Sequence, residues 1–294
     1  MKIKTSLSRK VFLSFNYVFL SIITIISLFP LIHIFAVSLS SNSAAQAGWV
    51  TIFPVDFTTE SYKFILAKKE FFAAFGVSAI RVVLGTAISM FVTIITAYAL
   101  SQPDHRFHAR KVYTWLFIVT MVFSGGLIPL FIVIKMVGIY NTIWALVLPS
   151  AVQVFNIILM LNFFRGIPYA LTESAFIDGA NHFTVLTKIY LPISKPSLAT
   201  VGLFTIVFHW NSWFDGMVFI SNPAKYPLQT YLRNLIQSVN SSSLDINSIE
   251  LMRLVSQKTL TAAQIFIAII PILILYPWLQ KYFVKGMTLG SVKE

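Results

Sequence analysis

The sequence of 294 residues contains no cysteine and few charged residues, and both absences limit what the chain can do. Without cysteine it forms no disulfide bond and no thiolate metal site, so the redox compartment cannot be inferred. Only 11% of the residues are charged, whereas a soluble domain usually carries about 25%. The hydrophobic share of 57% and the mean hydropathy of +0.79 instead predict a membrane protein with several spans.

Catalytic motifs are also missing. The chain has no Gly-x-x-x-x-Gly-Lys-Ser/Thr phosphate loop and not even a Gly-Lys dipeptide, so it has no nucleotide site of this type. Its histidines are scattered and lack the His-Glu-x-x-His spacing of a zinc site (His33, His105, His108, His182 and His209). We expect a non-catalytic chain without a metal site. If ATP drives its function, a different subunit must hydrolyse it.

The apolar runs predict an all-α integral membrane protein, with one membrane domain over residues 1–294. Six spans are expected, at about residues 11–38, 71–101, 112–137, 142–164, 198–220 and 260–282. A signal peptide cleaved near Ala45-Gln46-Ala47 is the alternative for the first run. The run is longer than the roughly 7 to 15 apolar residues of such peptides, which favours an uncleaved span. Residues 42–70 are expected to form a folded external loop.

Two features inside the spans are unusual. Ser124-Gly125-Gly126 and Pro129 interrupt the third span. Irregular backbone is tolerated where neighbouring helices or a cavity satisfy it, so we expect this break to lie inside the bundle. A simple kink without a role in transport fits this pattern equally well. Arg81 lies within the second span, where we expect it to extend toward the outer surface; the alternative is that it faces the bundle interior.

The net charge of +12 would suggest a nucleic-acid partner in a soluble protein. Here the basic residues lie mostly in short loops between apolar runs, so topology and lipid head groups explain them and no nucleic acid is expected. With the N-terminus inside, the cytoplasmic segments carry 13 lysines and arginines and the external ones 8. This bias predicts that both termini are cytoplasmic.

Residues 169–196 form a segment with a polar start between apolar runs. The pattern predicts two short helices, the first capped by Thr172 and stopped by Gly179, the second capped by Asn181 and ended by Pro192. Such a helix pair should lie on a surface and not span the membrane.

The spacing of this segment resembles the cytoplasmic EAA loop in the membrane subunits of binding-protein-dependent ABC importers. That loop reads Glu-Ala-Ala, three residues, Gly, nine residues, Ile-x-Leu-Pro, and the matching residues are Glu173, Ala175, Gly179, Ile189, Leu191 and Pro192, with Ser174 at the second alanine. Further segments resemble the carbohydrate-uptake branch, the maltose-type and lipoprotein-dependent oligosaccharide permeases: residues 123–129, 138–144, 163–168, 177–181, 209–215, 226–229 and 280–286.

The resemblance implies a permease subunit of a type I ABC importer in a bacterial cytoplasmic membrane, for a carbohydrate such as an oligosaccharide. Its partners would be a homologous second permease, two ATP-binding subunits that hold ATP and Mg, and an extracellular solute-binding protein. Residues assigned to ATPase coupling are Glu173, Ser174, Ala175, Asp178, Gly179, Ala180, Phe183, Leu186, Ile189, Leu191 and Pro192. Glu173 and Asp178 would pair with the partner, and Phe183, Leu186 and Ile189 would form the apolar dock. A helix pair lying on lipid is the alternative.

The segment His209-Trp-Asn-Ser-Trp-Phe-Asp215 is a second candidate site, placed within the fifth span. If the helix is continuous, Asn211 and Asp215 share one face, as do Trp210 and Phe214. Aromatic faces and polar groups together suit a sugar pathway, so its candidates are Trp210, Asn211, Trp213, Phe214 and Asp215. An outer aromatic belt with a hydrogen bond between helices explains the same residues equally well.

Residues 226–237, with Pro227 near their start, predict an amphipathic helix followed by a loop at 238–248. Its apolar face consists of Leu228, Tyr231, Leu232, Leu235 and Ile236. In the resembled family this region reaches toward the binding protein; a helix lying on the bilayer is the alternative. Two rival functions remain: an ion-coupled secondary transporter, which would bury several ionisable residues, and an intramembrane enzyme, which would cluster His, Asp or Glu.

Overall fold

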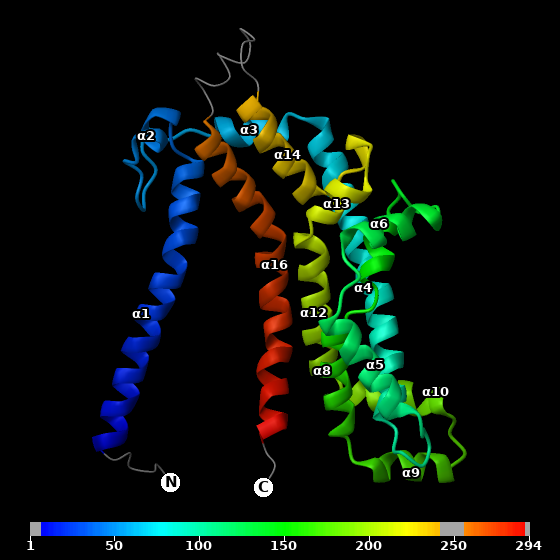
Figure 1. Ribbon diagram of the computed structural model, residues 1–294. Coiled ribbons are helices and arrows are strands. Elements are labelled where there is room, and N and C mark those ends of the chain that lie inside the picture. Colours follow the sequence, from blue (N-terminus) through cyan, green and yellow to red (C-terminus); the bar gives the residue numbers. More distant parts are fainter. Residues whose placement is uncertain (1–6, 242–255, 292–294) are drawn as a thin grey trace. The chain divides into compact units, whose positions relative to one another are not determined.

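The computed structural model describes residues 7–241 and 256–291, and all of their regular secondary structure is helical (Figure 1). The chain divides into two compact units, residues 1–68 with 234–270 and residues 69–233 with 271–294. The expected single membrane domain therefore stays a prediction. Some residues used in the charge count, among them Lys2, Lys4, Arg253 and Lys293, lie outside the described residues.

The first unit contains α1 (Leu7–Ser38), α2 (Asn42–Ala47), α3 (Glu60–Leu66) and the first part of α16 (Gln257–Ser291). Most apolar side chains of α1 are exposed, as expected for a helix surrounded by lipid. After it the chain folds tightly: Ser41 Oγ accepts a hydrogen bond from the backbone N–H of Ala44 and caps α2, and Gly48 ends α2 at φ +76°. The folded loop predicted for residues 42–70 is confirmed.

The second unit is built on α4 (Lys69–Ser101), which packs against α8 (Val154–Arg165) and α12 (Lys195–Asn211) (Figure 1). Its further elements are α5 (Arg110–Val122), α6 (Leu127–Met136), α7 (Trp144–Val147), η1 (Leu148–Ser150), α9 (Tyr169–Ile177), α10 (His182–Val185), the π-helical turn η2 (Leu186–Tyr190), α11 (Leu191–Ile193), α13 (Phe214–Phe219), η3 (Pro223–Lys225) and the start of α14 (Leu228–Ser241).

Small and polar residues explain how closely α4 is packed. Its buried positions recur every three or four residues along one face: Ala74, Ser78, Arg81, Gly85, Ser89, Thr93 and Ala97. Without a hydrophobic force between helices in lipid, association depends on close backbone approach and on hydrogen bonds between helices, which such a stripe permits. The largest buried cluster lies at the C-terminal end of α4, where Tyr98 and Leu100 meet residues of α8, η2 and α12.

Length and composition allow six membrane crossings. Residues 7–38, 69–101 and 257–277 are single helices long and apolar enough to span a bilayer. Three bent pairs complete the number, with bends of 113° between α5 and α6, 46° between residues 144–150 and α8, and 85° between residues 182–193 and α12. The predicted break at Ser124-Gly125-Gly126 is confirmed, since α5 ends at Val122 and α6 begins at Leu127.

Two details of the spans differ from expectation. The break in the third span lies on the surface, because the residues from Phe123 to Gly126 are exposed and no side chain of α5 is buried. Its predicted position inside the bundle of this chain is therefore wrong. The predicted fifth span at 198–220 is divided as well, since α12 stops at Asn211 and α13 resumes at Phe214.

The amphipathic helix predicted after Pro227 is confirmed as α14 (Leu228–Ser241), which includes residues 238–241 of the predicted loop. Leu228, Leu232 and Leu235, which belong to the predicted apolar face, are buried. The backbone N–H of Leu228 donates to Ser78 Oγ of α4 at 2.8 Å, so the start of α14 is bound to α4. The remainder of the predicted loop, residues 242–248, lies outside the described residues.

Candidate functional site

Residues 169–196, called the coupling loop below, connect α8 to α12 by a chain of short helices. The prediction of two helices separated by Gly179 is confirmed: α9 ends at Ile177, and Gly179 adopts φ +82°. The backbone N–H of Ala180 then donates to Ala175 O at 2.9 Å, as in a glycine-ended helix. Asn181 Oδ1 accepts from the N–H of Thr184 at 2.8 Å and caps α10, as predicted.

Two predictions for this loop are wrong. Thr172 does not cap α9, which begins at Tyr169; it lies inside the helix, fully buried, with its hydroxyl 3.2 Å from Tyr190 Oη. Pro192 does not end the second helix either. The π-helical turn η2 widens the backbone before it, and α11 places Pro192 in its first turn, where the missing N–H costs nothing.

The residues assigned to coupling divide into an exposed and a buried group. The exposed group consists of Glu173, Ser174, Asp178, Gly179, Phe183 and Pro192. The half-buried group packs against the core cluster at the C-terminal end of α4 and consists of Ala175, Ala180, Ile189 and Leu191. Leu186 is buried within that core, so its predicted place in an apolar dock is wrong. The EAA spacing did not indicate Ile177, which is 86% exposed and, with Phe183 at 73%, adds exposed apolar area to the loop. Only its apolar type next to Asp178 and Gly179 would have indicated it.

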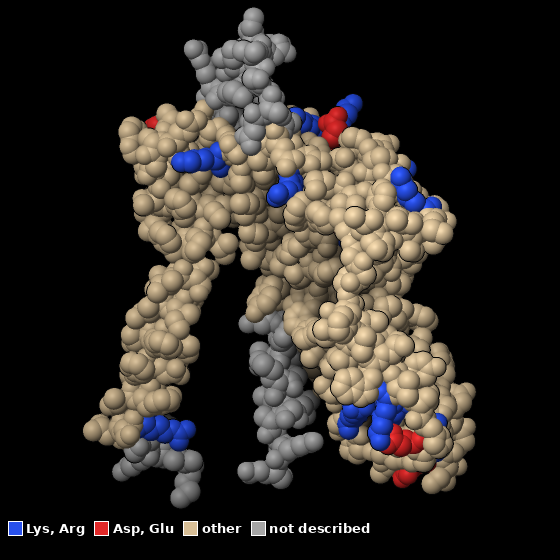
Figure 2. Space-filling model, in the orientation of Figure 1, with Lys and Arg blue, Asp and Glu red and all other residues tan. Residues whose placement is uncertain are grey.

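Charged side chains gather at this end of the second unit (Figure 2). Asp104, between α4 and α5, pairs with Arg110 Nε at 2.5 Å and Lys111 Nζ at 3.5 Å. Partial desolvation raises the pKa of Asp104, but attraction to Arg110 and then Lys111 outweighs it, so this pKa lies below its usual range. Nearby, the Arg106 guanidinium stands over the Phe176 ring of α9, 4.1 Å from its centroid.

A buried ion pair involves Arg81, in the middle part of α4. Arg81 is fully buried, so its predicted extension toward the outer surface is wrong and the alternative, facing the interior, is correct. Arg81 Nη1 donates to Asp215 Oδ1 and to Ser212 O, both at 3.1 Å, and Nη2 pairs with Asp215 Oδ2. A charge at membrane depth needs such a partner.

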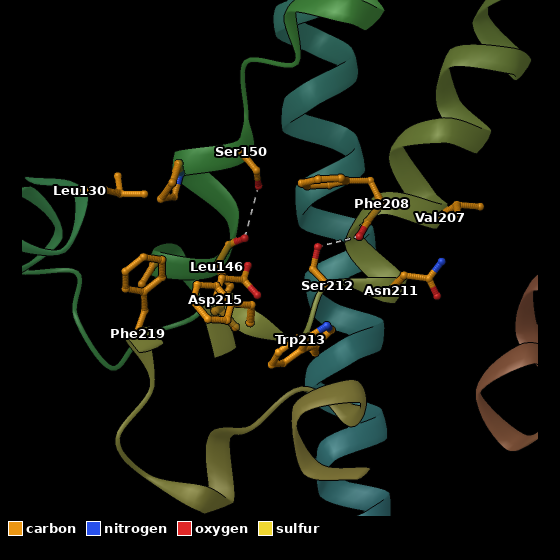
Figure 3. Close-up of a pocket in the computed structure, with 13 residues that line it drawn as sticks. Leu130, Leu146, Ser150, Val207, Phe208, Asn211, Ser212, Trp213, Asp215 and Phe219 are labelled. Atoms are coloured by element: carbon orange, nitrogen blue, oxygen red, sulfur yellow. Dashed lines mark hydrogen bonds between the residues drawn. The ribbon is translucent and has the colours of Figure 1, made fainter. Parts of the chain in front are cut away.

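The ion pair holds a break in the helix. Since α12 stops at Asn211 and α13 begins at Phe214, Asn211 and Asp215 are not one turn apart on a continuous helix, and the predicted shared faces are wrong. At the break Ser212 Oγ donates to Phe208 O at 2.8 Å (Figure 3). The freed backbone groups are thus partly satisfied by side chains, as irregular structure within a membrane requires.

Around this break lies a pocket of about 520 Å³, shown in Figure 3. Of the predicted pathway residues, Asn211, Trp213, Phe214 and Asp215 line it, while Trp210 does not; it is buried against Phe75. Ser212 of the same segment and the flanking residues Val207, Phe208 and Phe219 also line it. Residues distant in the sequence complete the wall, and no local motif could have indicated them: Leu130, Ala145, Leu146, Pro149 and Ser150. The pocket combines aromatic faces with hydroxyl, amide and carboxylate groups.

Comparison with known proteins identifies the family. Residues 106–289 match the family described as binding-protein-dependent transport system inner membrane component. The chain is 37% identical over 277 residues to the polygalacturonan/rhamnogalacturonan transport system permease protein YtcP of Bacillus subtilis, covering 94% of this chain and 96% of the relative. It is 39% identical over 279 residues to protein LplC of the same organism, covering 95% of this chain and 93% of LplC.

A solved structure agrees in fold. One chain of a bacterial ABC transporter involved in the import of the acidic polysaccharide alginate superposes with a TM-score of 0.82 at 34% identity, over 96% of this chain and all of that chain. Both the coupling loop and the pocket fall within residues 106–289. The chain therefore belongs to the family of inner-membrane permease components of binding-protein-dependent transport systems.

Proposed function

We propose that this chain is one of two permease subunits of an ATP-driven importer that takes up a carbohydrate, an oligosaccharide in particular. The observation that carries the proposal is the coupling loop, which combines the EAA spacing with an exposed edge on a rigid base. Relatives named for polygalacturonan/rhamnogalacturonan and for alginate support a carbohydrate substrate. Assembly with a homologous permease, two ATP-binding subunits and an extracellular solute-binding protein completes the importer.

The coupling loop receives the movement of the ATPase. ATP and Mg bind to the partner subunits, and this chain supplies the surface they grip: Glu173 and Asp178 offer charge, while Ile177 and Phe183 offer exposed apolar area. Closure of the ATPase pair then moves the loop and the helices fixed to it as one body, which alternates the access of the pathway. The EAA end lies in the cytoplasm in this proposal, as do both termini.

The pocket at the helix break forms this chain's part of the sugar pathway. Trp213 and Phe214 offer aromatic surface for the C–H faces of a sugar ring, and Asn211 and Asp215 offer groups that bind hydroxyls. The sister permease would close the pathway from the other side. Family membership disfavours the rival ion-coupled transporter, and Asp215, the carboxylate placed within a span, is already neutralised by Arg81.

The test is purification of the tagged chain from its own membranes in mild detergent, followed by identification of its partners and an ATPase assay. We expect a second permease and an ATPase to be recovered, with ATP hydrolysis stimulated by a sugar-loaded binding protein. A chain that purifies alone and transports under an ion gradient without ATP would refute the proposal.

A further inference from the structure

We propose that Tyr98 is a positioning residue that fixes the coupling loop to α4, so that movement of the loop is passed to the pocket end of that helix. The inference rests on the proposed function, because it assigns a mechanical role in the same coupling. It concerns a residue outside the EAA segment and outside the pocket.

Tyr98 joins α4 to the second half of the coupling loop. Its side chain is 8% exposed, and its hydroxyl lies 3.0 Å from His182 Nδ1, the first residue of α10. Its ring also stands at 88° to the ring of Tyr190, with 5.1 Å between centroids. One side chain of α4 thus contacts both α10 and the π-helical turn that follows it.

Tyr190 continues this connection to the first half of the loop. Its hydroxyl lies 3.2 Å from Thr172 Oγ1, which is fully buried in α9. The bend at Gly179 separates α9 from α10, so Tyr98 and Tyr190 together bind the helices on both sides of that bend. Without these bonds the loop could turn at Gly179 while α4 stayed still.

Hydrogen bonds are needed here in addition to the apolar core. Leu186, Val185 and Phe164 bury the base of the loop, but apolar contact has no preferred direction and allows small rotations. A hydrogen bond between a hydroxyl and a ring nitrogen has a preferred distance and direction, so it restricts such rotations. The Tyr98 hydroxyl therefore determines how faithfully the loop and α4 move together.

The position of Arg81 on α4 indicates where the movement is transmitted. Tyr98 lies 17 residues after Arg81, about 25 Å along the helix axis. Arg81 contacts Ser212 and Asp215, which line the pocket. A single continuous helix therefore makes polar contacts with the loop through Tyr98 and with the helix break through Arg81, and both residues belong to the second unit.

The experiment uses the complete importer, purified through this chain, with a single reporter cysteine at Asn211→Cys. Because the chain has no native cysteine, labelling of this chain by a membrane-impermeant thiol reagent reports on the pocket alone. The rate is compared without nucleotide and after trapping with ATP, Mg and vanadate. Tyr98→Phe keeps the ring and removes the hydroxyl; we expect subunit recovery and ATP hydrolysis to persist while the nucleotide-dependent change in labelling falls at least threefold.

Matched variants separate positioning from folding. Tyr113→Phe, at an exposed tyrosine near the same end, should behave as the parent. His182→Asn, which keeps a polar atom near the Nδ1 position, should retain more of the labelling change than His182→Phe. The double variant Tyr98→Phe/His182→Phe should be no worse than the more affected single variant, because both remove the same bond.

The outcomes against the inference are distinct. An unchanged labelling response in Tyr98→Phe, additive losses in the double variant, or loss of the assembled complex in Tyr98→Phe would each overturn it. If the parent complex itself contains no ATPase or shows no nucleotide-dependent labelling, the proposed function falls and the role of Tyr98 falls with it. A responsive parent with a responsive Tyr98→Phe removes only the role of Tyr98.

Discussion

The guanidinium of Arg81 on α4 donates hydrogen bonds to both carboxylate oxygens of Asp215 on α13, although 134 residues separate them in the sequence. The Arg81 side chain is fully buried, and that of Asp215 is 25% exposed toward the pocket. The pair ties the break after α12 to the central helix of the second unit. Because each charge makes burial of the other tolerable, the two residues should be interdependent.

Arg81→Ala leaves the Asp215 carboxylate without its partner, and we expect a loss of about 3 kcal/mol in stability. Asp215→Leu should cost a similar amount, whereas the double variant Arg81→Met/Asp215→Leu should be more stable than either single change. The measurement is the midpoint temperature of thermal denaturation in detergent. Denaturation is followed by the loss of the single peak that the folded protein gives in size-exclusion chromatography. Equal midpoints for Arg81→Ala and the parent would show that the pair does not hold the break.

Gly85 allows α12 to approach α4 closely. A Cβ atom at Gly85 would collide with the imidazole ring of His209, whereas one at Gly76 on the same helix would meet nothing within 4 Å. We expect Gly85→Ala to destabilise the protein by about 1 to 3 kcal/mol through overpacking. Gly76→Ala, the matched control, should be neutral or stabilise by up to about 1 kcal/mol through helix propensity.

The same denaturation midpoints test this prediction, together with Gly85→Ala/His209→Ala. Removing the imidazole should restore part of the lost stability, because it removes the collision. A Gly85→Ala variant as stable as Gly76→Ala would mean that α4 and α12 are not in close contact at this position.

Gly179 supports coupling through its backbone. At φ +82° most side chains cost roughly 1 to 2 kcal/mol, Asn and Asp less, and Asp would also add a charge beside Asp178. We expect Gly179→Asp to abolish sugar uptake while membrane insertion stays intact, because the bend that presents Ile177 and Phe183 is lost. The control is Gly138→Asp, which carries the same backbone strain at φ +78° outside the coupling loop. Normal uptake by Gly179→Asp would remove the coupling assignment.

Asn211 tests the pocket. Its side chain is exposed at the helix break, so truncation should affect the sugar and not the fold. We expect Asn211→Ala to lower uptake about fivefold to tenfold, the value of one lost hydrogen bond to a hydroxyl. Asn162→Ala, at an exposed asparagine of α8 outside the pocket, serves as the control. Equal uptake by the two variants would place the sugar elsewhere.

The sequence by itself determined the class of protein, the approximate positions of the six apolar runs, the bend at Gly179 and the cap at Asn181. These features depend on local properties: hydropathy over about 20 residues, the left-handed conformation that glycine permits, and short side chains that bond to nearby backbone. The EAA spacing was visible for the same reason, since all of its residues lie within one short segment.

Only the tertiary structure decided which side of each element is buried and which distant residues meet. The local pattern could not show that Leu186 packs inward while Ile177 stays exposed, nor that Thr172 lies buried beneath Tyr190. The local pattern favoured an Arg81 that extends outward, whereas the structure turns it inward to pair with Asp215. No proline or glycine marks the helix break at Ser212 in the sequence. Contacts from α4 hold this break in place, so the local sequence did not predict it. Such contacts depend on how helices pack across the whole unit, and local sequence patterns do not show which distant residues meet.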